Sequence, residues 1–459
     1  GLGVAFVKTV RHFWPELNRW LDRIPDTRFM PFVDYDKKFL LWWGVILFCC
    51  KLGSRRQLDY DLRDMETQVL GNTNRLANTR QDSLPVNKTL PHFLGHTGFA
   101  AIADLRTLIV RRLIRMKALD DYRLNGDFVV AADGTGYLTF RKRHCAHCLT
   151  KTHGGTTTYF HPVLEAKLLT SSGLALSIGS EFIENPTVGD TGTLPRRSAA
   201  ADYETIKQDC ELNAFIRLAL SLKKQFPQTP LCISGDSLFA CGTSVQICSD
   251  NEWSFVFTFK QGRTRTVWED FKGLLKLAPE NSRRIILPGG VQQQYRWVND
   301  LPFKDSKGRA HSLNALMCME TDQGKITTFA WVTSYRIHAN NAATIAEKGG
   351  RIRFKIENEG FNMQKNSGLN MEHAYCFGED AFKAFYYLMQ IAHIILQMVE
   401  KGSLLKILAR KYNATERSLF GSLKNIARRL LESFRYFAIP DDAFRDAVSA
   451  SPKIRLDSG

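Results

Sequence analysis

Asp133 and Asp236 each follow a short apolar run that is typical of a buried strand, Phe128–Ala132 before the first and Leu231–Gly235 before the second. A single Asp after a strand is more often a turn or cap residue than a ligand. Two carboxylates held on strand ends, however, could bind divalent cations such as Mg²⁺ through hard oxygen ligands. The pair therefore predicts metal-dependent phosphoryl transfer, if a third ligand is present.

The third ligand that we predict is Glu357, on a helix. Arg353, Glu357, Phe361 and Lys365 follow one another at steps of four, so on a regular helix they form one stripe. The same charges could equally form a solvated stripe of salt bridges. Glu359 is the competing carboxylate, and it would lie about 160° around the helix from Glu357, off this stripe.

A second group of metal-ligand residue types lies between the two Asp residues. Cys145 and Cys148 have the C-x-x-C spacing of a zinc site, and His153 and His161 follow them. The segment could hold a structural Zn²⁺ through these four side chains. The alternative is a basic loop with two reduced thiols that contacts DNA through its charges. The cations of that loop are Arg141, Lys142 and Arg143.

The elements around these residues predict an α/β fold. The apolar run before Asp133 and the segments Tyr159–Leu169 and Leu174–Ile178 read as three strands, followed by an amphipathic helix over Asp209–Phe226 and a strand before Asp236. This order of three strands, a helix and a strand is that of an RNase H-like sheet. Further strands are expected at Trp253–Phe259, Arg284–Leu287, Gln292–Val298, Leu313–Met319 and Thr327–Val332.

The chain exceeds the roughly 250–300 residues at which single cores stop growing, so several domains are expected. We predict an RNase H-like catalytic core with a β-rich insertion, a helical N-terminal domain before it and a helical C-terminal tail after it. The regions are 1–122, a helical DNA-binding domain; 123–250, the first part of the core; 251–338, the β-rich insertion; 339–400, the second part of the core with the catalytic helix; and 401–459, a basic helical region.

The charge of the chain favours a polyanionic partner. Lys and Arg number 62 against 46 Asp and Glu, which leaves a net charge of +16. Residues 1–120 and 401–459 both carry a basic surplus and are candidate DNA-handling arms. The longest apolar run, Phe39–Cys50, is shorter than the ~20 residues of a membrane-spanning helix and predicts a buried helix. We expect no membrane association, a cytoplasmic location and reduced cysteines.

Taken together, these segments resemble the DDE-type transposases of bacterial insertion sequences, in the branch with a β-strand insertion between the second Asp and the Glu. In that branch the Glu belongs to a signature of Tyr, two residues, Arg, three residues, Glu, six residues and Lys. Arg353 and Glu357 match this spacing, whereas Gly350 stands at the Tyr position and Lys365 lies one residue beyond the Lys position. The matching segments are Ala132–Thr135, Tyr159–Glu184, Lys207–Glu211, Gly235–Ala240, Arg353–Lys365 and Asn370–His373.

The resemblance implies cleavage at transposon ends and strand transfer into target DNA, with Mg²⁺ or Mn²⁺ held by Asp133, Asp236 and Glu357. It implies double-stranded DNA as partner, including the terminal inverted repeats, a homodimer or larger synaptic assembly, and a location with the bacterial nucleoid. Arg353 and Lys365 would contact DNA phosphates. Trp297 and Trp331 could grip a flipped base, although a core position is favoured for both. The alternatives are an RNase H-like nuclease without strand transfer and a domesticated, catalytically silent DNA-binding protein.

Overall fold

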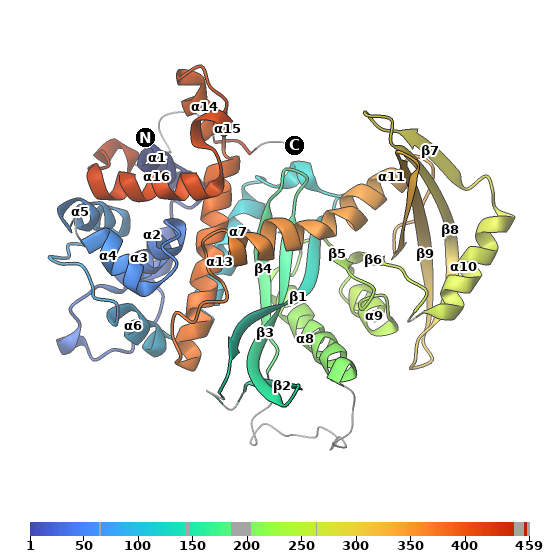
Figure 1. The fold of residues 1–459 in the computed structure, drawn as a ribbon, viewed down its shortest axis with the longest axis horizontal. Coiled ribbons are helices and arrows are strands. Elements are labelled where there is room, and N and C mark those ends of the chain that lie inside the picture. The colour runs from blue at the N-terminus through green and yellow to red at the C-terminus, as the bar shows by residue number, and fades with distance from the viewer. Residues whose placement is uncertain are drawn as a thin grey trace.

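The computed structural model describes residues 1–63, 66–142, 145, 147–184, 203–262, 264–444 and 454–456 (Figure 1). It is a mixed α/β protein, which confirms the predicted fold class at that level. One mixed sheet runs through the molecule, with helices at one end and against its faces (Figure 1). The order along the sheet is β2-β3-β1-β5-β6-β10-β9-β8-β7, and β4 pairs with β3 beside this path.

Three predicted strands are present at the start of the sheet, and a further strand over residues 149–153 was not predicted. β1 (Phe128–Phe140) pairs antiparallel with β3 (Thr156–Leu169), which pairs antiparallel with β2 (Leu149–His153) and with β4 (Ala175–Phe182). The sequence predicted that the first strand ends at Asp133. Only the parallel pairing with β5 stops before that residue; the antiparallel partner β3 continues, so β1 extends beyond Asp133 with an irregularity after Gly136.

Two parallel strands complete the central part of the sheet. β5 (Leu231–Gly235) pairs parallel with β1, and β6 (Ser254–Thr258) pairs parallel with β5. The sequence assigned β6 to the insertion, but its pairing makes it a neighbour of β5. The connection between β5 and β6 contains α9 (Gly242–Asp250).

The predicted β-rich insertion extends the same sheet. Its strands pair antiparallel with one another, and β10 also pairs antiparallel with β6. Trp297 and Trp331 are buried there, 4% exposed each, as the favoured interpretation predicted. The insertion also contains a helix that the sequence analysis missed. The elements are α10 (Arg265–Leu277), β7 (Ser282–Ile286), β8 (Gln292–Lys304), β9 (Ala310–Asp322) and β10 (Lys325–Thr333).

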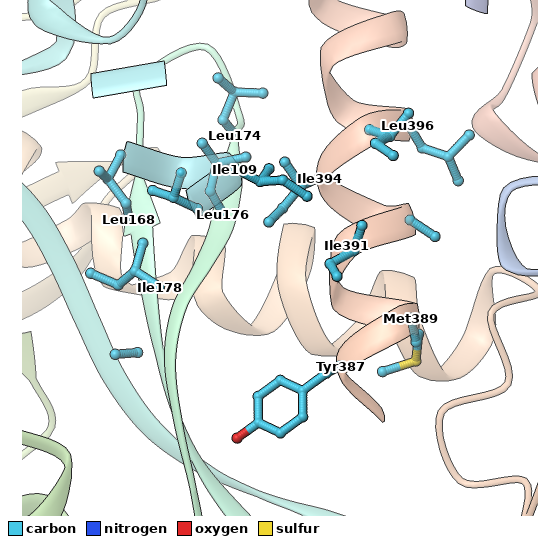
Figure 2. Packing of buried hydrophobic residues seen from close by; sticks show 14 of the residues in the cluster. Ile109, Leu168, Leu174, Leu176, Ile178, Tyr387, Met389, Ile391, Ile394 and Leu396 are labelled. Atoms are coloured by element: carbon cyan, nitrogen blue, oxygen red, sulfur yellow. The ribbon is translucent and has the colours of Figure 1, made fainter. Parts of the chain in front are cut away.

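Helices pack against β3 and β4. α8 (Tyr203–Gln225) lies against β4, where Gly179 leaves room: a Cβ there would stand 2.7 Å from the Leu218 side chain. α13 (Glu379–Lys401) and α7 (Phe99–Arg115) also pack against β4 and against each other. Figure 2 shows buried side chains of this region, among them Ile394 of α13, Ile109 of α7 and Leu176 of β4.

α13 has the length and apolar composition of a membrane span, and the bent pair α6–α7 passes the same test as one unit. The tested window of α13 is entirely buried inside the protein, which is how a core helix behaves. α13 also carries buried polar side chains, including Gln390 and His393, which take part in hydrogen bonds. α13 is therefore a core helix that separates the sheet from the N-terminal helices (Figure 1).

The two ends of the chain form one helical lobe, although the sequence divided them into separate regions. Asn72 donates to the carbonyl oxygens of Phe434 and Phe437, and helix α16 packs against α1 and α5. The predicted buried helix at Phe39–Cys50 is confirmed as α3. The helices of this lobe are α1 (Leu2–Phe13), α2 (Leu17–Asp22), α3 (Lys37–Cys49), α4 (Arg55–Arg63), α5 (Glu66–Ala77), α6 (Thr89–Thr97), α14 (Ser403–Lys411), α15 (Glu416–Phe420) and α16 (Leu423–Tyr436).

A helical stretch over residues 342–366 follows the insertion and returns to the sheet. It changes its hydrogen-bonding pattern repeatedly, and two of its segments are π-helical. The second π-helical segment contacts β1, β3 and β4. The consecutive pieces are α11 (Ala342–Ile345), η3 (Ala346–Gly350), η4 (Arg351–Arg353), η5 (Ile356–Phe361) and α12 (Asn362–Asn366).

Candidate active site

Asp133 lies within β1, and Asp236 directly follows β5, the parallel neighbour of β1. Phe128 pairs with Leu231 and Ala131 with Ser234, so every β5 residue follows its β1 partner by 103 positions. Asp236 follows Asp133 by the same interval. The pairing itself ends at Ala131 and Ser234. Both carboxylates therefore follow the last paired residues by two positions, near the same end of two neighbouring strands.

Both carboxylates are fixed by the backbone around them. Asp133 Oδ1 accepts a hydrogen bond from the backbone N–H of Gly134 at 3.0 Å. Asp236 Oδ1 accepts one from the backbone N–H of Leu238 at 2.8 Å, just after β5 ends. Each side chain is partly exposed, so neither is sealed in the core. Rigid and accessible oxygens of this kind are suitable ligands for a hard cation.

The pKa of Asp133 shows how the surrounding groups act on it. Burial raises this pKa from 3.8 to about 6, and the negative charges of Asp236 and Glu357 act in the same direction. The Arg353 guanidinium and the Gly134 N–H act against them. The charges of both other predicted carboxylates therefore act on the pKa of Asp133.

Arg353 connects the helical stretch to the first strand. Its guanidinium nitrogen lies 3.0 Å from Asp133 Oδ2, and the two side chains are 18% and 26% exposed. Four residues later along the chain, Glu357 is exposed within the π-helical segment η5. Helical segments with π geometry occur frequently at functional sites, because the irregular turn presents side chains that a regular helix would hide.

Glu359, the competing carboxylate, lies elsewhere. Its carboxyl carbon is 4.0 Å from the position that a Cβ on Gly173 would occupy, in the turn between β3 and β4, and Lys401 lies beside the same glycine. Lys355 donates to the Ser171 carbonyl in the same turn. Of these two carboxylates, Glu357 is the one whose charge acts on the pKa of Asp133, whereas Glu359 lies beside the turn at Gly173.

Glycines allow the helical stretch to approach the sheet closely. A Cβ at Gly350 would stand 2.3 Å from Trp331 Cε2, and one at Gly349 would stand 2.8 Å from Val256. Gly360 meets Lys167 in the same manner, at 2.9 Å from its Cδ. These contacts leave no space for side chains, so small residues are required where the helix crosses β6, β10 and β3.

The predicted stripe of Arg353, Glu357, Phe361 and Lys365 is not a single face of the helix. Phe361 is 1% exposed and belongs to the core, whereas Glu357 is exposed. The reason is the π-helical turn over residues 356–361, which changes the angle between successive side chains. Lys365 forms an ion pair with Glu372 at 3.0 Å.

A buried hydrogen-bond network fixes the end of the helical stretch, and no sequence pattern predicted it. Gln364, fully buried, donates to Gln390 Oε1 at 2.7 Å and lies 3.0 Å from His393 Nδ1. The Lys167 ammonium on β3 donates to the same Gln390 oxygen at 2.9 Å. The helix that carries Glu357 is thus joined to α13 and β3 by side chains that water does not reach.

Glu211 of α8 is a further carboxylate beside the site. Its Oε1 is 2.8 Å from the position that a Cβ on Gly134 would take, next to Asp133. Only a glycine at position 134 allows this approach. The glycine after Asp133 therefore provides space for the Glu211 side chain.

The predicted second metal site is brought together only in part. The ligand atoms of Cys145, Cys148 and His161 all lie within 4.8 Å of one another. Among the described residues, no other group of three His, Cys, Asp or Glu side chains is this compact. The three carboxylates above are more widely spaced. His153 is exposed at the far end of β2, opposite Thr156, and is not in the group.

The predicted basic loop is described only in part. Arg141 and Lys142 are exposed just after β1 ends, and Arg143 lies outside the described residues. Two exposed cations at a strand end could contact a phosphate backbone, as could cations at many other surface positions.

Comparisons with known proteins add no identification: no protein-family model matches this chain, and no curated protein sequence matches it.

Proposed function

We propose that this protein is a DNA transposase of the DDE type, which cleaves DNA at transposon ends and joins it to target DNA. The observation that carries the proposal is the register of the two parallel strands. Asp133 and Asp236 each lie two residues beyond the last paired residues of the parallel strands β1 and β5, and Arg353 and Glu357 of the helical stretch act on the pKa of Asp133. Three carboxylates held by different elements are the arrangement that metal-dependent phosphoryl transfer requires.

The topology supports an RNase H-like core. β1, β3 and β4 form an antiparallel meander, α8 follows, and β5 and β6 add parallel to β1. This is the element order that the family resemblance implies. The antiparallel strands β7–β10 lie between Asp236 and Glu357 in the chain. This is where the β-strand insertion lies in the family branch that the sequence resembles.

The departures from the family signature have structural reasons that support the proposal. A π-helical turn contains one residue more than an α-helical turn. The turn over residues 356–361 therefore displaces Lys365 by one position in sequence while keeping it near the face expected of the signature Lys. Gly350 stands at the Tyr position because the Trp331 ring of β10 occupies the space beside it.

Asp133, Asp236 and Glu357 are the residues that would hold Mg²⁺ or Mn²⁺. Their donor set consists of oxygens, which both ions prefer. Burial is the main cause of the raised pKa of Asp133, and a divalent cation beside the carboxylate would favour its charged form. When bound, such ions polarise the scissile phosphate and lower the pKa of an attacking water or hydroxyl. Arg353, now paired with Asp133, would be available to a DNA phosphate.

The partner that we propose is double-stranded DNA. The net charge of +16 favours a polyanion, and Arg141 and Lys142 add exposed cations on the connection after β1. Pairing two transposon ends requires at least two copies of the site, so we propose a homodimer or larger assembly. A protein with this substrate would work in the bacterial cytoplasm, on the nucleoid.

The DNA that flanks the reading frame is first searched for terminal inverted repeats. DNA that carries these repeats then serves as the substrate in a cleavage and strand-transfer assay. Purified protein with Mg²⁺ or Mn²⁺ should release the ends and join them to a plasmid. Nicked products without joining would support a nuclease, and a band shift without cleavage would support a silent DNA-binding protein. Either of the last two results would overturn the proposal. Asp270→Asn, at an exposed position on α10, is the matched active control.

A further inference from the structure

Cys145, Cys148 and His161 form a compact triangle of soft donor atoms. The two sulfur atoms lie 3.4 Å apart, and His161 Nε2 lies 3.4 Å from Cys145 Sγ and 3.3 Å from Cys148 Sγ. A disulfide would place the sulfurs at about 2.05 Å. Neither cysteine is in a disulfide in this structure.

The triangle has nearly the dimensions of a zinc site. With Zn–S near 2.3 Å and Zn–N near 2.0–2.1 Å, tetrahedral coordination separates two sulfurs by about 3.8 Å and a sulfur from a nitrogen by about 3.6 Å. The distances here are shorter by about 0.2–0.4 Å. A small outward movement of the side chains would therefore admit the ion.

The hairpin of β2 and β3 creates this proximity. Leu149 pairs with Phe160, so the next position of the same register brings Cys148 opposite His161. Cys148 and His161 are both 0% exposed, and Cys145 is partly exposed on the connection from β1. The ligands thus come from a rigid strand and from the loop that precedes the hairpin, which is a common arrangement for structural zinc.

The second ring nitrogen of His161 faces a carboxylate. His161 Nδ1 lies 3.5 Å from Glu184 Oε1, and the other oxygen of Glu184 accepts a hydrogen bond from Lys383 Nζ at 2.8 Å. A carboxylate beside Nδ1 favours the proton on that nitrogen, which leaves the lone pair on Nε2, toward the sulfurs, as metal-binding histidines require.

We propose that Cys145, Cys148 and His161 bind a structural Zn²⁺, with Glu184 orienting the histidine. Two thiolates and an imidazole select zinc over magnesium, so this site is distinct in chemistry and place from the carboxylate site. A water molecule would complete the coordination of the ion. The ion fastens the connection between β1 and β2 to β3, and Lys383 links the site to the core helix α13.

The direct test is zinc content of the full chain, purified under reducing conditions without chelator. The wild type should contain about one zinc per chain. Cys148→Ser and His161→Ala should each lose it, whereas Cys241→Ser, at a free cysteine before α9, should retain it. Glu184→Gln should keep zinc with an affinity lower by about 10- to 100-fold.

A second measurement protects the test against variants that fail to fold. Chelator-treated wild-type protein, titrated with Co²⁺, should develop thiolate-to-cobalt charge-transfer absorption, and its melting temperature should rise. Less than half an equivalent of zinc in the wild type, retention of zinc by both ligand variants, absence of the cobalt bands, or a Cys145–Cys148 disulfide in the reduced preparation would each overturn the proposal. None of these readouts depends on DNA cleavage.

Discussion

Arg353 and Asp133 form an ion pair at 3.0 Å between the helical stretch that carries Glu357 and the central strand of the sheet. Because both side chains are more than two thirds buried, the pair is shielded from solvent more than a surface ion pair is. Among the described residues, it is also the one ion pair between two of the predicted site residues. Its removal should therefore affect both stability and the electrostatics of the site.

Arg353→Gln should lower the free energy of unfolding by about 2 kcal/mol, because a charge-assisted hydrogen bond to a partly buried carboxylate is lost. The pKa of Asp133 should rise further, since the guanidinium now lowers it. Urea denaturation measures the first effect. The control is Arg336→Gln, which removes an ion pair with Asp300 whose members are 73% and 64% exposed; this should cost less than about 1 kcal/mol. Equal losses would contradict the prediction.

Gly350→Ala should destabilise the protein by about 3 kcal/mol or more, because the added Cβ would stand 2.3 Å from the Trp331 ring. Gly273→Ala is the control, since a Cβ there on α10 meets nothing within 4 Å. That substitution should be neutral or stabilise by up to about 1 kcal/mol. Thermal unfolding compares the two variants. If Gly350→Ala is as stable as Gly273→Ala, Trp331 does not fill the space beside the helix.

Gln390→Leu should lower the free energy of unfolding by about 2–4 kcal/mol. Lys167 and Gln364 both donate to the side-chain oxygen of Gln390, and these buried donors would lose that acceptor. Gln292→Leu, at an exposed position at the start of β8, should change stability by less than about 0.5 kcal/mol. Denaturant midpoints with unchanged slopes would measure the difference. A cost below 1 kcal/mol for Gln390→Leu would mean that the network does not anchor the helix.

Lys51 gives a prediction for the pH dependence of stability. Burial lowers its pKa from 10.5 to about 8, and no described residue offers its ammonium a hydrogen-bond partner. Between about pH 8 and 10.5 the unfolded chain keeps this proton, whereas the folded protein loses it. At pH 7 the lysine is charged in both states, and its buried charge destabilises the fold. Lys51→Met should raise the free energy of unfolding at pH 7 by about 1–3 kcal/mol.

The gain from Lys51→Met should shrink as the pH rises through the range between the two pKa values, because the wild-type lysine there loses its charge in the folded state, where that charge is destabilising. Denaturant unfolding at pH 7, 8.5 and 10 would follow this trend. Lys325→Met, at an exposed position at the start of β10, serves as a control and should show no such trend. A gain that is constant with pH would contradict the assignment of the effect to Lys51.

Sequence patterns predicted those elements whose burial is uniform along the segment. The apolar runs before Asp133 and Asp236 became β1 and β5, and the run Phe39–Cys50 became α3, because continuous apolar composition reports burial on all sides. α10 was missed within a region rich in strand-forming residues. Its signal was present, since Val267, Phe271 and Leu275 are buried at helical spacing.

What the sequence could not predict depends on partners that are distant in the chain. The π-helical turn at residues 356–361 changes which side chains share a face of the helix, and no local sequence pattern predicted this turn. The space at Gly350 is decided by Trp331, and the position of His161 is decided by a strand register. The end of β1 was misplaced because its antiparallel partner β3 continues where its parallel partner β5 stops.

The most direct test of the proposed carboxylate site is a single-turnover cleavage assay on DNA carrying the flanking inverted repeats. Asp236→Asn and Glu357→Gln should each reduce the cleavage rate by more than about 10³-fold while leaving DNA binding intact. Glu359→Gln, whose parent carboxylate lies by the turn at Gly173, should remain within a few-fold of the wild type. Cleavage that persists in Glu357→Gln, or that is lost in Glu359→Gln alone, would contradict the account.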